Sequence, residues 1–158
     1  MKRPEKELYY LRIAAAILAR GTCLRRNYGA VIVNNDQIVC TGYTGSPRGD
    51  ANCCDQGTCR REEIGAAPGE RYDLCNSVHA EMNAIISAGR DRCIGAIIYV
   101  VGQEVKSGKY IGTEPCHLCT RMIKNAGIHA AVVPTENFNT FLTIGGYDAE
   151  RIRSTVIY

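Results

Sequence analysis

Two short motifs constrain this chain more than any other feature: His79-Ala80-Glu81 and, farther along, Pro115-Cys116-His117-Leu118-Cys119. One imidazole and two thiolates suit zinc, and a set of three protein ligands leaves a fourth position open for water. Zinc lowers the pKa of such a water towards neutrality. Glu81 lies two residues after the first ligand, where a carboxylate can move protons to and from the water without binding the metal. The motifs together predict a hydrolytic zinc centre with His79, Cys116 and Cys119 as ligands and Glu81 as the catalytic acid–base group.

Each motif alone has a more ordinary interpretation. His-Ala-Glu also occurs in helices that carry no site, and Cys-x-x-Cys also occurs in structural zinc hooks and redox pairs. The order and separation of the two motifs are more specific. H-x-E followed by P-C-x-x-C resembles the signature of the zinc-dependent base deaminases, in which the glutamate is the proton shuttle and not a zinc ligand.

Bulk composition excludes several classes of protein. A chain of 158 residues with 46% hydrophobic and 22% charged residues is typical of one globular domain, here expected over 1–158. The net charge of +3 is too small to argue for nucleic-acid binding, because it requires no concentrated basic face. No apolar run approaches the ~20 residues of a membrane span, and the charged N-terminus lacks a signal-peptide core. We therefore expect a cytoplasmic protein with a small-molecule substrate, no nucleic-acid partner and no membrane.

Apolar periodicity predicts an α/β fold. The first helix is expected to begin near Pro4 and to end at Arg20, and two further helices are expected over 78–88 and 116–124. Strands are expected over 28–33, 37–43, 96–101, 128–133 and 152–157, with loops over 44–52 and 102–112. The segment 53–76 is polar and has no sustained periodicity, and 134–146 is expected to be a loop with room for one helical turn. The first two strands flank Asn34-Asn35-Asp36 and predict a hairpin, which makes the sheet mixed. Alternating strands and helices in the later half place helices on both faces of that sheet.

With these residues in view, the chain resembles the deoxycytidylate (dCMP) deaminases of the cytidine deaminase-like superfamily. The resemblance covers nearly the whole chain, in the segments Cys23–Arg26, Gly29–Val33, Gly42–Gly49, His79–Ala84 and Pro115–Cys119. It implies a three-layer α/β/α sandwich with a five-stranded mixed sheet and zinc held at the starts of two helices. It also implies a homo-oligomer, with a hexamer favoured, and regulation by dCTP and dTTP.

One departure from that family bears on the substrate. The family carries Asn where this chain has Thr44, in a loop associated with the sugar and with nucleotide regulation. The resemblance implies hydrolytic conversion of dCMP to dUMP with release of ammonia. Two alternatives stay open: a deaminase of another cytosine nucleoside, nucleotide or aminated heterocycle, and a catalytically retired, zinc-stabilised nucleotide-binding protein. An intact Glu81 argues against the retired protein.

The remaining cysteines predict a second zinc. The long polar segment before His79 is similar to that of family members with a second, closed site, and four thiolates make a tetrahedral structural site. The expected ligands are Cys23, Cys54, Cys59 and Cys75, with Cys53 as the rival of Cys54. Such a site would order an aperiodic stretch, because metal binding contributes folding free energy. Incidental free thiols are the alternative.

A monophosphate substrate needs cationic donors near the pocket. Any one arginine of this chain is, taken singly, more typical of a solvated surface than of a binding site. As a group, the candidate phosphate and sugar contacts are Arg25, Arg26, Asn27, Thr44, Ser46 and Arg48.

Overall fold

The computed structural model describes residues 3–112, 114–136 and 138–145. Its helices are α1 (Lys6–Leu18), α2 (Cys53–Gln56), α3 (Arg60–Glu63), the 3-10 helix η1 (Tyr72–Leu74), α4 (Ala80–Ala88), α5 (Arg90–Cys93) and α6 (His117–Asn125). Its strands are β1 (Arg26–Asn34), β2 (Gln37–Tyr43), β3 (Ile97–Glu104), β4 (Tyr110–Ile111), β5 (Ala130–Pro134) and β6 (Phe141–Ile144). None of the helices in these ranges has the length and apolar composition needed to cross a membrane.

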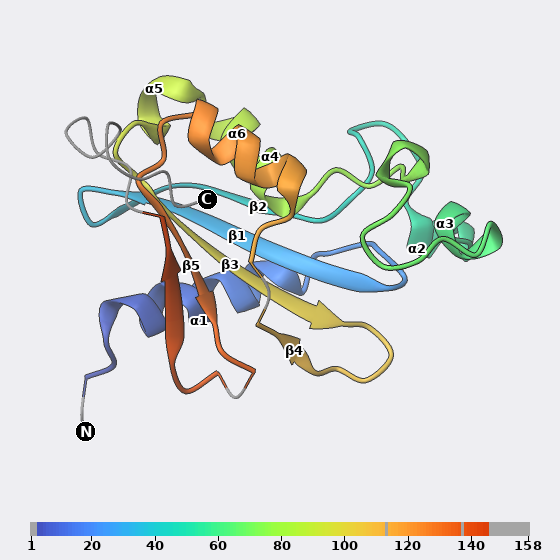
Figure 1. The fold of residues 1–158 in the computed structure, drawn as a ribbon, viewed down its shortest axis with the longest axis horizontal. Helices are drawn as coiled ribbons and strands as arrows, with labels where there is room; N and C mark the ends of the chain where they lie inside the picture. Colours follow the sequence, from blue (N-terminus) through green and yellow to red (C-terminus); the bar gives the residue numbers. More distant parts are fainter. Residues whose placement is uncertain (1–2, 113, 137, 146–158) are drawn as a thin grey trace.

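The strands form one mixed sheet in the order β2-β1-β3-β5-β6, with the short β4 paired to β3. Only β3 and β5 run parallel among the described strands, joined by a crossover through α6. Helix α1 covers one face, while α4, α5 and α6 cover the other (Figure 1). The predicted three-layer arrangement around a mixed sheet is therefore confirmed, with six strands rather than five.

Both faces of the central strands are buried, because side chains alternate between two cores. On β1, Ala30 and Ile32 face the core beneath α4 and α6, whereas Val31 and Val33 face the core beneath α1. Strands β3 and β5 alternate in the same way. Continuous apolar runs are typical of strands covered on both sides. This is why 96–101 and 128–133 could be predicted as buried strands.

The β1–β2 hairpin forms as predicted. Asn35 and Asp36 both have positive φ, 48° and 61°, which is the conformation of a two-residue type I′ turn. Two glycines on this hairpin let helices approach closely. A Cβ on Gly29 would lie 2.6 Å from Leu18 N of α1, and a Cβ on Gly42 would lie 2.5 Å from Ala84 N of α4. Each helix therefore packs directly on strand backbone.

Several element predictions need correction. Two regions predicted as loops contain strands. The region 102–112 contains the end of β3 and all of β4, and the region 134–146 contains β6. The segment 53–76, for which no element was predicted, contains α2, α3 and η1. Apart from β3, whose end was predicted too early, these elements are two to four residues long and too short for periodicity to reveal them. The edge strand predicted over 152–157 lies outside the described residues.

Candidate active site

The three predicted zinc ligands converge at the starts of two helices. Cys116 Sγ lies 3.4 Å and Cys119 Sγ 3.3 Å from His79 Nδ1, and all three ligand atoms lie within 4.8 Å of one another. Nitrogen and sulfur ligands of a tetrahedral zinc, at their usual bond lengths, are roughly 3.6 Å apart. Both the donor set and its spacing fit a zinc ion.

Helix capping explains how the local sequence places these ligands. His79 is the N-cap of α4, with extended dihedrals, because Val78 before it pairs with Gly45 in an isolated antiparallel bridge. Cys116 is the N-cap of α6, and its sulfur accepts a hydrogen bond from Cys119 N. The helices begin at Ala80 and His117, slightly later than predicted, so these two ligands precede the helices. The positive ends of both dipoles favour anionic groups there.

The charges of the ligands and of Glu81 are strongly coupled. The hydrogen bond from Cys119 lowers the pKa of Cys116 to about 4, and the same bond raises the pKa of Cys119. A hydrogen bond with Cys116 raises the pKa of His79. Glu81 is only 5% exposed, and this burial raises the pKa of its carboxyl. A carboxyl with a raised pKa can hold a proton between two transfers, as an acid–base catalyst must.

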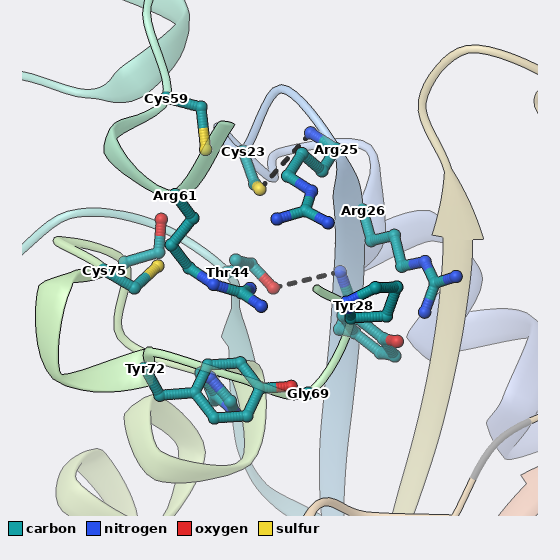
Figure 2. A pocket seen from close by; sticks show the side chains of 13 residues that line it. Cys23, Arg25, Arg26, Tyr28, Thr44, Cys59, Arg61, Gly69, Tyr72 and Cys75 are labelled. Atoms are coloured by element: carbon teal, nitrogen blue, oxygen red, sulfur yellow. Dashed lines mark hydrogen bonds between the residues drawn. The ribbon is translucent and has the colours of Figure 1, made fainter. Parts of the chain in front are cut away.

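A pocket opens beside His79 and is strongly cationic. Among the described residues, the side chains that line it include three arginines but no aspartate or glutamate: Cys23, Arg25, Arg26, Tyr28, Thr44, Cys59, Arg61, Pro68, Gly69, Tyr72, Cys75, Ser77 and His79. Figure 2 shows the side chains of Arg25, from the loop before β1, and Arg61, from α3, directed toward each other, while Arg26 at the start of β1 points to one side. The pocket therefore suits an anionic ligand next to the zinc ligands.

Of the predicted substrate contacts, Arg25, Arg26 and Thr44 line this pocket. Arg25 Nη1 is buried and has no hydrogen-bond partner in the described part of the chain. The Thr44 hydroxyl accepts a hydrogen bond from Tyr28 N at 3.0 Å (Figure 2), so its own hydrogen can be donated elsewhere.

The other three predicted contacts lie elsewhere. Asn27 Oδ1 accepts a hydrogen bond from Cys23 N and holds the loop that precedes β1. Ser46 and Arg48 line a separate groove, which Arg20 and Asn83 also line. The prediction that these residues contact the same ligand as Arg25 is not supported by their positions.

A second group of cysteines lies beside the pocket. Cys59 and Cys75 line both the pocket and an adjoining groove that Cys53 also lines, and the charge of Cys53 interacts with Cys23, Cys59 and Cys75. Among the described residues, only the His79 set has three or more ligand atoms within 4.8 Å of one another, so these cysteines converge more loosely.

The structure favours Cys53 over its rival Cys54 for the predicted second zinc site. Cys54 is exposed, and its thiol donates to Asp55 Oδ1 at 3.6 Å. Cys53 occupies the position predicted for Cys54. Neighbouring residues on a helix point about 100° apart, so only one of the two can face the other cysteines.

Two residues that line the pocket are absent from the sequence-based candidates. Arg61 and Tyr72 lie in the segment 53–76, which has no periodicity and whose contacts depend on tertiary structure. The Tyr72 ring packs edge-on against His79, with centroids 5.1 Å apart, and the Arg61 guanidinium lies over the Tyr72 ring. Neither residue is close enough to His79 in the chain for a local spacing signal to have revealed it.

Comparisons with known proteins agree with this geometry. Residues 4–135 match the model of the cytidine and deoxycytidylate deaminase zinc-binding region. The chain is 37% identical over 142 residues to the deoxycytidylate deaminase of Mycobacterium phage D29, covering 87% of this chain and all of that protein. It is 34% identical over 133 residues to the deoxycytidylate deaminase of Schizosaccharomyces pombe, covering 84% of this chain but only 38% of that protein.

The fold has solved counterparts as well. The dCMP deaminase of cyanophage S-TIM5, in complex with dCMP and dUMP, superposes with a TM-score of 0.56 at 24% identity. The match covers 83% of this chain and 82% of the phage protein. At this level of identity, the likeness concerns the fold.

Proposed function

This chain belongs to the family of cytidine and deoxycytidylate deaminases with a zinc-binding region, and we propose that it hydrolyses dCMP to dUMP with release of ammonia. The observation that carries the proposal is the convergence of His79, Cys116 and Cys119 with the buried Glu81, beside a cationic pocket. The name of the phage D29 relative, similar along its whole length, supports dCMP as substrate. The substrate and product bound to the cyanophage enzyme point the same way.

The roles of the residues follow from their chemistry. His79, Cys116 and Cys119 would hold zinc, which supplies the Lewis acidity that brings the pKa of a water molecule towards neutrality. Glu81 takes a proton from this water as its oxygen attacks C4 of the cytosine. Glu81 gives this proton to N3, then takes the second proton from the hydroxyl now on C4 and delivers it to the departing amine, so water and dCMP become dUMP and ammonia. The raised pKa of Glu81 keeps the proton on the carboxyl between the two steps.

The lining of the pocket supports specific substrate contacts. Arg25 and Arg26 are proposed to bind the phosphate, because the unpartnered Arg25 Nη1 is a buried donor without an acceptor. Thr44, which keeps one hydrogen to donate, is proposed to contact the sugar.

The decisive experiment is ammonia release from purified protein supplied with dCMP, cytidine, deoxycytidine and dCTP in parallel assays. We expect turnover of dCMP. The Glu81→Gln variant should keep its zinc and lose at least ~100-fold in kcat, the usual scale of general acid–base catalysis. Near-normal activity of this variant would refute the role of Glu81. If the zinc-loaded wild type releases no ammonia from any of the four compounds, dCMP deamination is refuted. The next substrates to test are then other aminated heterocycles.

We propose in addition a second, structural zinc held by Cys23, Cys53, Cys59 and Cys75. Four thiolates from separate segments are typical of closed tetrahedral sites. The loose approach of these sulfurs around the short helices α2 and α3 supports the assignment. Reduced thiols of this kind favour a cytoplasmic location, where disulfides rarely persist.

The remaining proposals concern assembly. A single domain over 1–158 would form a homo-oligomer, with a hexamer favoured, regulated by dCTP and dTTP as the family resemblance implies. Ile86 and Ile94, 68% and 50% exposed on and beside the adjoining helices α4 and α5, support a subunit contact on that face. Light scattering coupled to size-exclusion chromatography, with and without each nucleotide, measures the mass directly.

A further inference from the structure

Arg61 is held firmly in the wall of the pocket although it forms no charge pair there. Its side chain is 8% exposed, and its Nε and Nη2 donate to the carbonyl oxygens of Glu70 and Ala67 at 2.8 and 3.0 Å. These two bonds use two of the five N–H donors of a guanidinium. Backbone carbonyls orient the group without neutralising it, so three donors and a full charge remain.

The surroundings contain no carboxylate to balance this charge. In the ranges that the structure describes, no Asp or Glu oxygen lies within 4.0 Å of Arg61, whereas Arg60, its neighbour in α3, pairs with Glu63 at 3.2 Å. Arg25 and Arg26 line the same pocket, and Glu62 reaches only Arg25 Nε, at 3.9 Å. A buried unpaired charge is costly unless an anion joins it. The buried, unpartnered Arg25 Nη1 is a second and independent sign of a missing acceptor.

One aromatic ring links Arg61 to the zinc ligand His79. The Arg61 Cζ lies 4.6 Å from the centroid of the Tyr72 ring, and that ring packs against His79. The Tyr72 ring thus contacts both the Arg61 guanidinium and the metal ligand His79. Cation–π contact with Tyr72 fixes the guanidinium plane and preorganises its free donors.

We propose that Arg61 is a specificity-determining residue that binds the phosphate of the substrate and selects a nucleoside monophosphate over the free nucleoside. This inference rests on the proposed deaminase function and deepens it. The competing role for Arg61 is to balance the negative charge of the thiolates, since Cys59 lies two residues earlier. The two roles differ in what is lost when Arg61 is replaced.

The test compares Arg61→Gln, Arg61→Lys and the control Arg60→Gln, which removes the same charge from the exposed neighbouring side chain. Steady-state rates are measured with dCMP and with deoxycytidine, which lacks the phosphate, together with zinc content and inhibition by inorganic phosphate. A charged hydrogen bond contributes enough that Arg61→Gln should lower kcat/KM for dCMP by roughly 10- to 100-fold. Deoxycytidine turnover and zinc content should stay within about twofold, inhibition by phosphate should weaken, and Arg60→Gln should resemble wild type.

Arg61→Lys keeps the positive charge but loses the planar guanidinium donors, so we expect an intermediate loss of kcat/KM for dCMP and none for deoxycytidine. This variant replaces Arg61→Gln in the test if Arg61→Gln does not fold. Equal losses of kcat/KM for dCMP and deoxycytidine, or a loss of bound zinc together with activity, would overturn the inference. Either result would mean that Arg61 balances the charge of the thiolates. A wild type that is silent on dCMP instead overturns the proposed function. Calorimetric titration with dUMP and inorganic phosphate then decides on Arg61 alone, because unchanged binding in Arg61→Gln overturns its phosphate role.

Discussion

Gly42→Ala should disturb the active site indirectly, by displacing helix α4. A Cβ at this position of β2 would contact Ala80 O and lie 2.5 Å from Ala84 N, both backbone atoms of α4. Backbone cannot rotate away as a flexible side chain can, so α4 must move as a body. Overpacking costs about 1–3 kcal/mol, and contacts with two successive turns place this change near 3 kcal/mol. The moving helix begins at the His79 ligand and carries Glu81 in its first turn.

Gly29→Ala is the matched control on the opposite face. Its Cβ would contact Ala14 O and lie 2.6 Å from Leu18 N, so the change displaces α1, which carries none of the proposed ligands. With m-values of ~1–3 kcal/mol/M, a loss of about 3 kcal/mol lowers a urea midpoint by ~1–3 M. We expect both variants to lose stability to a similar extent. Only Gly42→Ala should also lose zinc affinity and turnover when assayed in the absence of denaturant, where both are folded.

Two results would refute this reasoning. A Gly42→Ala protein within about 0.5 kcal/mol of wild type, the ordinary effect of a surface change, would mean that the helix is not in direct contact with the strand. Equal loss of zinc affinity in both variants would mean that the site responds to global stability and not to the position of α4.

Two further predictions concern metal content and pH. Cys53→Ser should lower bound zinc from two to one per chain by elemental analysis while Cys54→Ser keeps both, and the reverse would restore Cys54 as the ligand. Burial and a hydrogen bond to Asp36 raise the pKa of Tyr10 from 10.0 to about 12. The folded state then holds the proton more tightly, so this stabilisation is intact below pH ~10 and is lost between ~10 and ~12. Across that pH range, the urea midpoint of Tyr10→Phe should fall less steeply with pH than that of the wild type. Part of the pH dependence should remain, because burial also raises the pKa of Tyr99 to about 12.

The elements predicted well are those whose signal is local. The hairpin followed from residues that tolerate positive φ, and the buried strands followed from runs that only a sheet covered on both faces can hide. The metal ligands were predictable because a helix start fixes the spacing of Cys116 and Cys119 and of His79 and Glu81. In each case the sequence within about one turn determines the geometry.

The errors have a common physical origin in tertiary context. Cys53 and Cys54 cannot be distinguished without the rotation of a four-residue helix, which no periodicity reveals. Ser46 and Arg48 share a loop with Thr44, yet they turn to another groove once Gly45 has paired with Val78. Arg61 reaches the pocket only because two carbonyls of a later loop hold it.

The order in which the two ligand sets occur along the chain has a consequence for biosynthesis. The cysteines proposed for the second zinc are complete at Cys75, whereas the catalytic set is complete only at Cys119, 44 residues later. At ~5–20 residues per second, a ribosome needs about 2–9 s to make that difference. A nascent chain can therefore bind zinc at the cysteine site before the catalytic zinc site has been synthesised. Zinc scarcity during translation would act on the folding of the N-terminal half before it acts on catalysis.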